Sequence, residues 1–242
     1  MARSILMVLL LLGAAVVSAC GGDSTDATIP ALLPDAATAQ FSTGPGNPYW
    51  PLLAGSRWVY EGKDDGEFEH IEVTVEAEVR RVMGVDAVVI RDVVSGTDGV
   101  IEDTFDWYLQ DNAGNVWYVG EDSKEIDDGE VVSTAGSWEA GVDGAQPGVI
   151  MWADPAAHVG AAYFQEYYPG EAEDKAEVLR RGDTVTVAAG TFDDVLVVRE
   201  WNPLEPGVTE LKYFAQGVGL ILEEIESGGE SRIELVEYLI GG

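Results

Sequence analysis

A strict alternation of apolar and polar residues runs from position 71 to position 80. The apolar members are Ile71, Val73, Val75, Ala77 and Val79, and the polar members are Glu72, Thr74, Glu76, Glu78 and Arg80. Because successive side chains of a strand point to opposite faces, this pattern predicts a β-strand with one buried face and one face in water. Such strands are typical of antiparallel sheets. A turn at Gly84–Asp86 and the segment Ala87–Val94 complete a predicted long hairpin.

A second hairpin is predicted between positions 101 and 119. One face of its first strand carries Ile101, Phe105, Trp107 and Leu109, and the other face carries Glu102, Thr104, Asp106 and Tyr108. The segment Asp111–Asn115 has the composition of a turn. With Asp111 opposite Asn115, Leu109 faces Trp117 and Tyr108 faces Tyr118.

Short apolar segments separated by glycine and proline continue to the C-terminus. Strands are expected at 57–60, 130–133, 149–152, 163–168, 171–181, 184–187, 195–201, 209–214, 220–226 and 233–240. The segment 171–181 also has helix-favouring composition, but its surroundings favour a strand. The spacing predicts an all-β fold, with a single antiparallel domain over residues 47–242. This domain is expected to be a curved sheet or an incompletely closed barrel.

The N-terminus has the anatomy of a secretory signal peptide over residues 1–19. Arg3 is its only charged residue, an apolar run extends from Ile5 to Val17, and Ser18 and Ala19 precede Cys20. The segment Val17–Cys20 resembles the bacterial lipobox, which implies that Cys20 receives a lipid and becomes the new N-terminus. The alternatives are a transmembrane anchor and a cleaved signal with an unrelated cysteine. The apolar run is short for a membrane span.

Residues 20–46 are rich in small residues and proline and lack any sustained periodicity, which predicts a flexible tether behind the lipidated cysteine. Cys20 is the only cysteine, so no disulfide can form within the chain. The domain that follows must therefore be stabilised by its packed core.

The charge balance excludes one class of partner. The chain has 44 acidic and 13 basic residues, for a formal net charge of −31. A field of this sign repels nucleic acid, so no nucleic-acid partner is expected. Acidic residues are scattered along the whole chain, which is typical of a solvated surface.

The sequence lacks the motifs of common enzyme and cofactor sites. His70 and His158 are its only histidines, which is too few for a typical zinc site. No nucleophile elbow, P-loop or dinucleotide-binding fingerprint is present. We therefore expect no cofactor, no metal and no catalytic activity.

Two weaker alternatives involve carboxylates. Calcium ligands are available at Glu171, Glu173 and Asp174 or at Asp122, Glu125, Asp127 and Asp128, although neither set fits an EF-hand loop. Glu166, between aromatic residues, is the best candidate for a carboxylate-based hydrolase.

The C-terminal third also carries a resemblance. The segments Gly190–Phe192, Trp201–Gly207 and Tyr213–Leu220, together with stretches around 107–118 and 165–174, resemble a group of uncharacterised bacterial lipoproteins. The resemblance implies a cell-envelope β-domain and supplies no catalytic residue.

The favoured function is therefore a lipid-anchored, non-catalytic binding or scaffolding module at the extracytoplasmic face of a bacterial membrane. Its partner would be an envelope protein or a small amphiphilic ligand. The candidate binding residues are Trp107, Tyr108, Trp117, Tyr118, Tyr167 and Tyr168. For the four aromatics of the second hairpin, holding the two strands together is the favoured role and a ligand platform is the alternative. The alternative is a carrier of a lipid or another amphiphile, which requires a large apolar cavity.

Lipidation is directly testable. We expect mass spectrometry of the native N-terminal peptide to find diacylglyceryl-modified Cys20, and the Cys20→Ser variant to leave the membrane fraction. An unmodified Cys20 that still follows the apolar segment would contradict this prediction.

Overall fold

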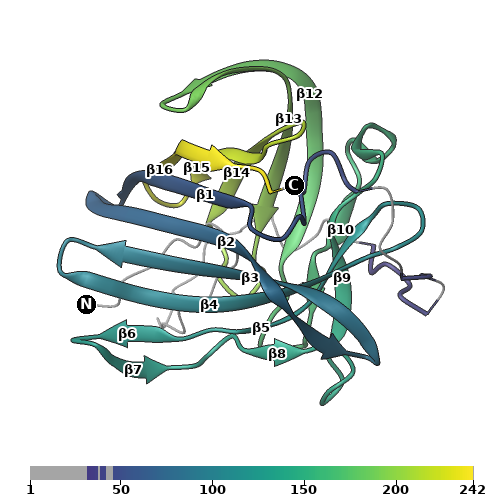
Figure 1. Ribbon diagram of the computed structural model, residues 1–242. Coiled ribbons are helices and arrows are strands. Elements are labelled where there is room, and N and C mark those ends of the chain that lie inside the picture. Colours follow the sequence, from purple (N-terminus) through teal and green to yellow (C-terminus); the bar gives the residue numbers. More distant parts are fainter. Residues whose placement is uncertain (1–31, 38, 42–45, 242) are drawn as a thin grey trace.

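One antiparallel sheet forms most of the computed structural model, which describes residues 32–37, 39–41 and 46–241 (Figure 1). The signal segment and Cys20 lie outside the described residues. The strands are β1 (Arg57–Asp64), β2 (Glu67–Val82), β3 (Val85–Gly96), β4 (Gly99–Gln110), β5 (Val116–Asp122), β6 (Glu125–Asp127), β7 (Glu130–Ser133), β8 (Trp138–Glu139), β9 (Gln146–Met151), β10 (Ala162–Phe164), β11 (Glu166–Tyr167), β12 (Lys175–Val187), β13 (Gly190–Trp201), β14 (Thr209–Ala215), β15 (Gly219–Ser227) and β16 (Ser231–Leu239).

The order of strands confirms the predicted fold class. Along the sheet it is β10-β12-β13-β14-β15-β16-β1-β2-β3-β4-β5-β9-β11, with β6, β7 and β8 attached at the side. All the strand pairs are antiparallel, and the first strand, β1, lies between β2 and the last strand, β16. The described part of the chain contains no helix long and apolar enough to cross a membrane.

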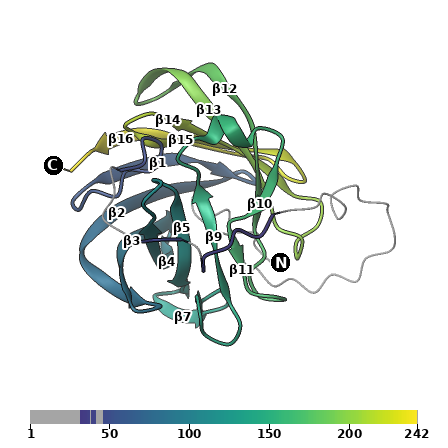
Figure 2. The ribbon, with the colours of Figure 1, turned by 90° about the vertical axis from the view of Figure 1, so that its right-hand side faces the viewer.

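The two edges of the sheet come together at Gln165. Strands β10 and β11 stand at opposite ends of the strand order, yet this one residue separates them in the chain. The sheet therefore curls back toward its own start, as Figure 2 shows, but no ladder between β10 and β11 closes it in the described residues. Gln165 is buried, and its amide Nε2 donates a hydrogen bond to Glu200 at 2.8 Å.

The long hairpin forms as predicted, but only part of its apolar face is buried. Ile71, Val73 and Val75 lie in the core, whereas Ala77 and Val79 are exposed. The expectation that this face is buried throughout is wrong at its far end. The register of β2 against β3 shifts between Val75 and Val79, and beyond this bulge the side chains at 77 and 79 lie outside the core.

The second hairpin has the predicted register, with Tyr108 opposite Tyr118 and Leu109 opposite Trp117. Its polar face, however, is the one that points into the curled sheet. Glu102, Thr104 and Asp106 are each at most 4% exposed. Polar residues therefore line the interior here, and the usual rule of apolar residues inside does not hold on β4.

Two other segments differ from expectation. The single strand predicted for 163–168 is two short strands, because Gln165 breaks the ladder and its backbone N–H donates to Asp174 O at 2.9 Å. The strands predicted at 171–181 and 184–187 are one strand, β12, which starts at Lys175 and passes Gly182 with several register shifts.

The described end of the predicted tether lies against the domain. Leu32 N–H donates to Ala162 O at 2.8 Å, and Phe164 N–H donates to Leu32 O at 2.9 Å, so Leu32 extends the edge at β10. Phe41 packs edge-on against Trp117, with ring centroids 6.0 Å apart. The domain therefore contacts residues that precede its predicted start at position 47.

Gly148 allows the two edges to approach each other. A Cβ atom at this position would lie 2.3 Å from the carbonyl carbon of Gln165, which is closer than real contacts. We expect Gly148→Ala to lower the free energy of unfolding in urea by about 1–3 kcal/mol, the usual range for overpacking. Gly96→Ala on β3 is the matched control, because its Cβ would meet its nearest atom at 3.7 Å. Equal stability of the two variants would contradict the close approach at Gln165.

Candidate functional site

A largely apolar groove of about 870 Å³ opens at one end of the curled sheet. It lies between the segment that precedes β1, the adjacent ends of β3 and β4, the turn after β14 and the residue after β16. Its lining is Gly46, Asn47, Pro48, Pro51, Leu52, Leu53, Val85, Asp86, Val88, Tyr108, Leu109, Gln110, Gly217 and Ile240. In Figure 1 the dark segment that leads into β1 runs beside the C-terminus at this end.

Few polar groups of the groove lining are available to a ligand. Asn47 is occupied, since its Nδ2 donates to Gly114 O at 3.0 Å and to Trp152 O at 3.1 Å. Asp86 is the one charged lining residue, and it accepts a hydrogen bond from Arg81 at 2.8 Å. Gln110 differs, because its Nε2 atom is buried and has no hydrogen-bond partner among the described residues.

The interior behind the groove contains a second unusual feature, which we call the carboxyl cluster. It consists of ten of the twelve acidic side chains of the described chain that are each at most 7% exposed: Glu69, Asp92, Glu102, Asp106, Glu121, Glu166, Asp174, Glu200, Glu210 and Glu223. Both carboxylate oxygens of Asp92 and of Glu121 lack a hydrogen-bond partner in the described chain. Acidic residues are rarely buried to this extent without a partner.

Burial keeps protons on this cluster. It raises the pKa of Asp106 to about 8, even though Tyr118 donates a hydrogen bond to Asp106 Oδ1 at 2.7 Å. Burial likewise raises the pKa of Glu166 to about 8 and that of Glu102 to about 7. The pKa of Asp92 is raised well above its usual value, first by burial and then by Asp106. At neutral pH many of these carboxyl groups are therefore neutral acids.

Lys212 is the one basic residue among the buried residues of the described chain. Its Nζ atom lies 2.7 Å from Glu200 Oε2, 3.5 Å from Glu223 Oε2 and 3.9 Å from Glu210 Oε2. Burial alone would lower the pKa of Lys212, but these three carboxylates raise it above its usual value. The ammonium group therefore stays charged and compensates part of the cluster.

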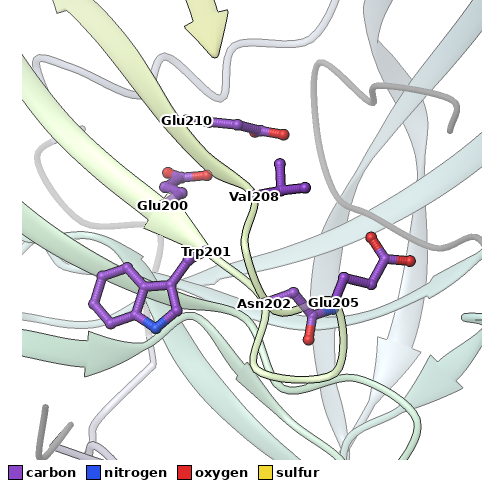
Figure 3. Close-up of a pocket in the computed structure, with 6 residues that line it drawn as sticks. All are labelled: Glu200, Trp201, Asn202, Glu205, Val208 and Glu210. Carbon is purple, nitrogen blue, oxygen red and sulfur yellow. The ribbon is translucent and has the colours of Figure 1, made fainter. Parts of the chain in front are cut away.

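A small cavity of about 10 Å³ lies beside Glu200 and Glu210. Figure 3 shows these two acids on neighbouring strands, with Trp201, Asn202, Glu205 and Val208 completing the lining. A cavity this size holds about one water molecule, so it is too small for an organic ligand.

Tyr108 separates the groove from the carboxyl cluster. It pairs with Val88 across β3 and β4, and Ile90 pairs with Asp106 two residues further along, so Tyr108 and Asp106 share the inward face. The Tyr108 hydroxyl is fully buried and has no hydrogen-bond partner in the described residues. The ring of Tyr108 lies 5.1 Å from that of Tyr118, whose hydroxyl donates to Asp106 Oδ1, so Tyr108 adjoins the cluster. Burial, followed by the nearby acids, raises the pKa of Tyr108.

The structure brings four of the six predicted binding aromatics together in the core. Trp107, Tyr108, Trp117 and Tyr118 are each at most 7% exposed. The rings of Tyr108 and Tyr118 lie 5.1 Å apart, and Trp117 Nε1 donates to Asp111 Oδ2 at 2.9 Å. Of these four, Tyr108 lines the groove.

The other two predicted aromatics lie at the edge of the sheet, on and just after β11. Tyr167 and Tyr168 are half-buried, and Tyr167 packs edge-on against Phe164 with centroids 4.8 Å apart. Neither of them lines the groove.

Glu166, the predicted candidate for hydrolysis, is completely buried and belongs to the carboxyl cluster. The nearby carboxyl group of Asp174 has its pKa raised well above the usual value, first by burial and then by Glu166. A substrate therefore has no access to Glu166 in this structure. Within the described ranges, no group of three or more His, Cys, Asp or Glu side chains is arranged to hold a metal ion.

The groove was not predicted from the sequence, although Tyr108 in its lining was. Its walls come from five separate parts of the chain, none of which forms a local motif. The one available signal is the apolar run at 48–53, which precedes the first strand and has no strand pattern of its own.

Among known proteins, this chain resembles solved structures only at low sequence identity. No family model and no curated protein matches the chain. Similar solved structures include a "putative lipoprotein" from Parabacteroides distasonis, at 14% identity and TM-score 0.43, covering 80% of this chain and 99% of that chain. Another is a "putative exported protein with YmcC-like fold" from Bacteroides fragilis, at 14% identity and TM-score 0.45, covering 79% and 98%. Neither description names an activity.

The carboxyl cluster predicts an unusual pH dependence of stability. Unfolded aspartate and glutamate lose their protons near pH 4, whereas Asp106 and Glu166 hold theirs up to a pKa of about 8. Between these values the folded chain binds more protons than the unfolded chain. We therefore expect the free energy of unfolding to fall as pH rises from about 4 to about 8.

Urea denaturation across this range, at constant ionic strength, measures the slope. Asp106→Asn should reduce it by up to the contribution of one proton, about 1.4 kcal/mol per pH unit. The control is Glu78→Gln, which removes one acid from the exposed part of β2. An equal change of slope in both variants would show that overall charge, not the interior, causes the dependence.

Proposed function

We propose that this chain is a non-catalytic binding protein of the bacterial cell envelope, anchored by lipid on Cys20, that holds an amphiphile or another apolar small molecule in its groove. This proposal combines the favoured binding module with the ligand class of the alternative carrier.

The groove is the observation that carries the proposal. Its volume of about 870 Å³ falls within the range of about 300–1,000 Å³ that is common for small-molecule sites. Leu53 is 52% exposed, and Leu52, Val88 and Ile240 are half-buried, so apolar side chains face open space. Exposed apolar surface that is gathered in a concavity marks a binding site more often than a chance feature.

The position of the groove fits an anchored protein. The predicted tether, residues 20–46, ends at Gly46, which lines the groove. Because Leu32 and Phe41 are already held against the domain, a lipid on Cys20 would keep the domain, and the groove with it, close to the membrane surface. Amphiphiles are most concentrated at such a surface.

The two other hypotheses have less support. A scaffolding surface built on the predicted aromatics requires their side chains to be accessible, and four of the six are buried. A hydrolase based on Glu166 requires a path for substrate, and Glu166 is enclosed.

Filling the groove should abolish binding. Val88 lines the groove on β3, so we expect Val88→Trp to weaken binding of the apolar fluorescent probe N-phenyl-1-naphthylamine by about tenfold or more. The measurement is a fluorescence titration of the mature chain, residues 20–242, carrying Cys20→Ser so that no detergent is needed.

Val93→Trp is the matched control, because Val93 is a half-buried valine of the same strand that does not line the groove. It should bind the probe as the parent protein does. Absence of probe binding by the parent protein, or equal binding by both variants, would contradict a ligand site in the groove.

A further inference from the structure

We infer that the groove is selective for the charge of its ligand: it accepts amphiphiles with uncharged or cationic heads and rejects anionic ones. This inference rests on the proposed function and names the ligand class of the same site.

The first argument is the composition of the groove wall. None of its lining residues is a lysine or an arginine. Arg81 does contact the lining, but its guanidinium is paired with Asp86 at 2.8 Å. Sites for carboxylate or phosphate heads in proteins typically supply arginine or lysine donors, and this wall offers neither in a free state.

The second argument is what lies behind the wall. Tyr108 lines the groove, and its ring packs 5.1 Å from that of Tyr118, whose hydroxyl donates to Asp106 of the carboxyl cluster at 2.7 Å. At neutral pH Asp92, Asp106 and Glu121 hold their protons, so the interior behind Tyr108 adds little charge of either sign. Above about pH 8 each member that ionises adds a negative potential, which repels an anionic head at the back of the groove and attracts a cationic one.

The third argument is the field of the whole chain. A formal net charge of −31 lowers the local concentration of anions and raises that of cations, most strongly in concave regions with low-dielectric walls. For an uncharged head, Gln110 is the lining residue with an unpartnered N–H donor in the described chain. Its Nε2 is buried in this structure, so the side chain must turn toward the groove to meet a head group. An N–H donor of this kind suits an ester carbonyl or a hydroxyl group.

Three ligands with the same dodecyl-length chain test the inference: monolauroylglycerol (uncharged), dodecylammonium (cationic) and dodecanoate (anionic). Each displaces N-phenyl-1-naphthylamine from the mature Cys20→Ser chain, below its aggregation concentration and with circular dichroism to verify the fold. We expect dodecanoate to bind at least about tenfold more weakly than monolauroylglycerol at low salt. The difference should shrink at high salt, where charges are screened.

A charge reversal provides the matched pair of variants. Asp86→Lys places a cation on the groove wall beside Arg81 and should restore dodecanoate binding to within about threefold of monolauroylglycerol. Asp98→Lys makes the same change of net charge at an exposed turn between β3 and β4, outside the groove lining, and should restore much less.

The outcomes separate the two proposals. Dodecanoate that binds as tightly as monolauroylglycerol in the parent chain would overturn the charge selection and leave the groove as a ligand site. Equal restoration by Asp86→Lys and Asp98→Lys would also overturn it, because net charge and not the groove wall would then set the preference. Failure of all three ligands and the probe to bind would overturn the proposed function itself.

Discussion

The burial of carboxyl groups inside a curled sheet is the constraint on which this structure depends. An ionised carboxylate in a low-dielectric interior costs several kcal/mol unless it is paired. One ammonium group, that of Lys212, serves three of the ten acids directly. Burial raises the pKa of the remaining acids, so they keep their protons and avoid the cost of a buried charge. Proton uptake thus limits the cost of the buried acids, while the apolar core packs around them.

This constraint explains how far the sequence could predict the fold. The alternation on β2 and the turn at Asp111 led to the correct sheet type and to the correct pairing of Tyr108 with Tyr118, because both depend on local geometry. Local geometry could not predict which face of β4 points into the interior. The pattern of Glu102 to Tyr108 is equally regular whichever face points inward. The choice depends on parts of the chain far away in sequence, such as Trp50, whose ring lies 5.5 Å from that of Tyr108 and 5.9 Å from that of Phe214.

The candidate site was even less accessible to sequence analysis. A groove made from the segment before β1, the ends of β3 and β4 and the residue after β16 exists only when those parts meet. Most of the aromatic residues that were predicted to form a binding surface lie in the core. Burying a pair of rings such as Tyr108 and Tyr118 against each other is more favourable than leaving them exposed to water. Among the six predicted aromatics, Tyr108 is the one that is buried in the core and also lines the groove.

The pairing of β1 with β16 determines when the domain can fold. Residues 57–64 lie against residues 231–239, so the sheet lacks a central strand pair until the last segment has been synthesised. Contacts of such long sequence separation form slowly, because a long loop must close before they contribute any stability. During translation the chain therefore remains without its complete core almost to its last residue. A polypeptide that stays open for this long exposes unpaired strand edges, which are sites of aggregation until β16 is in place.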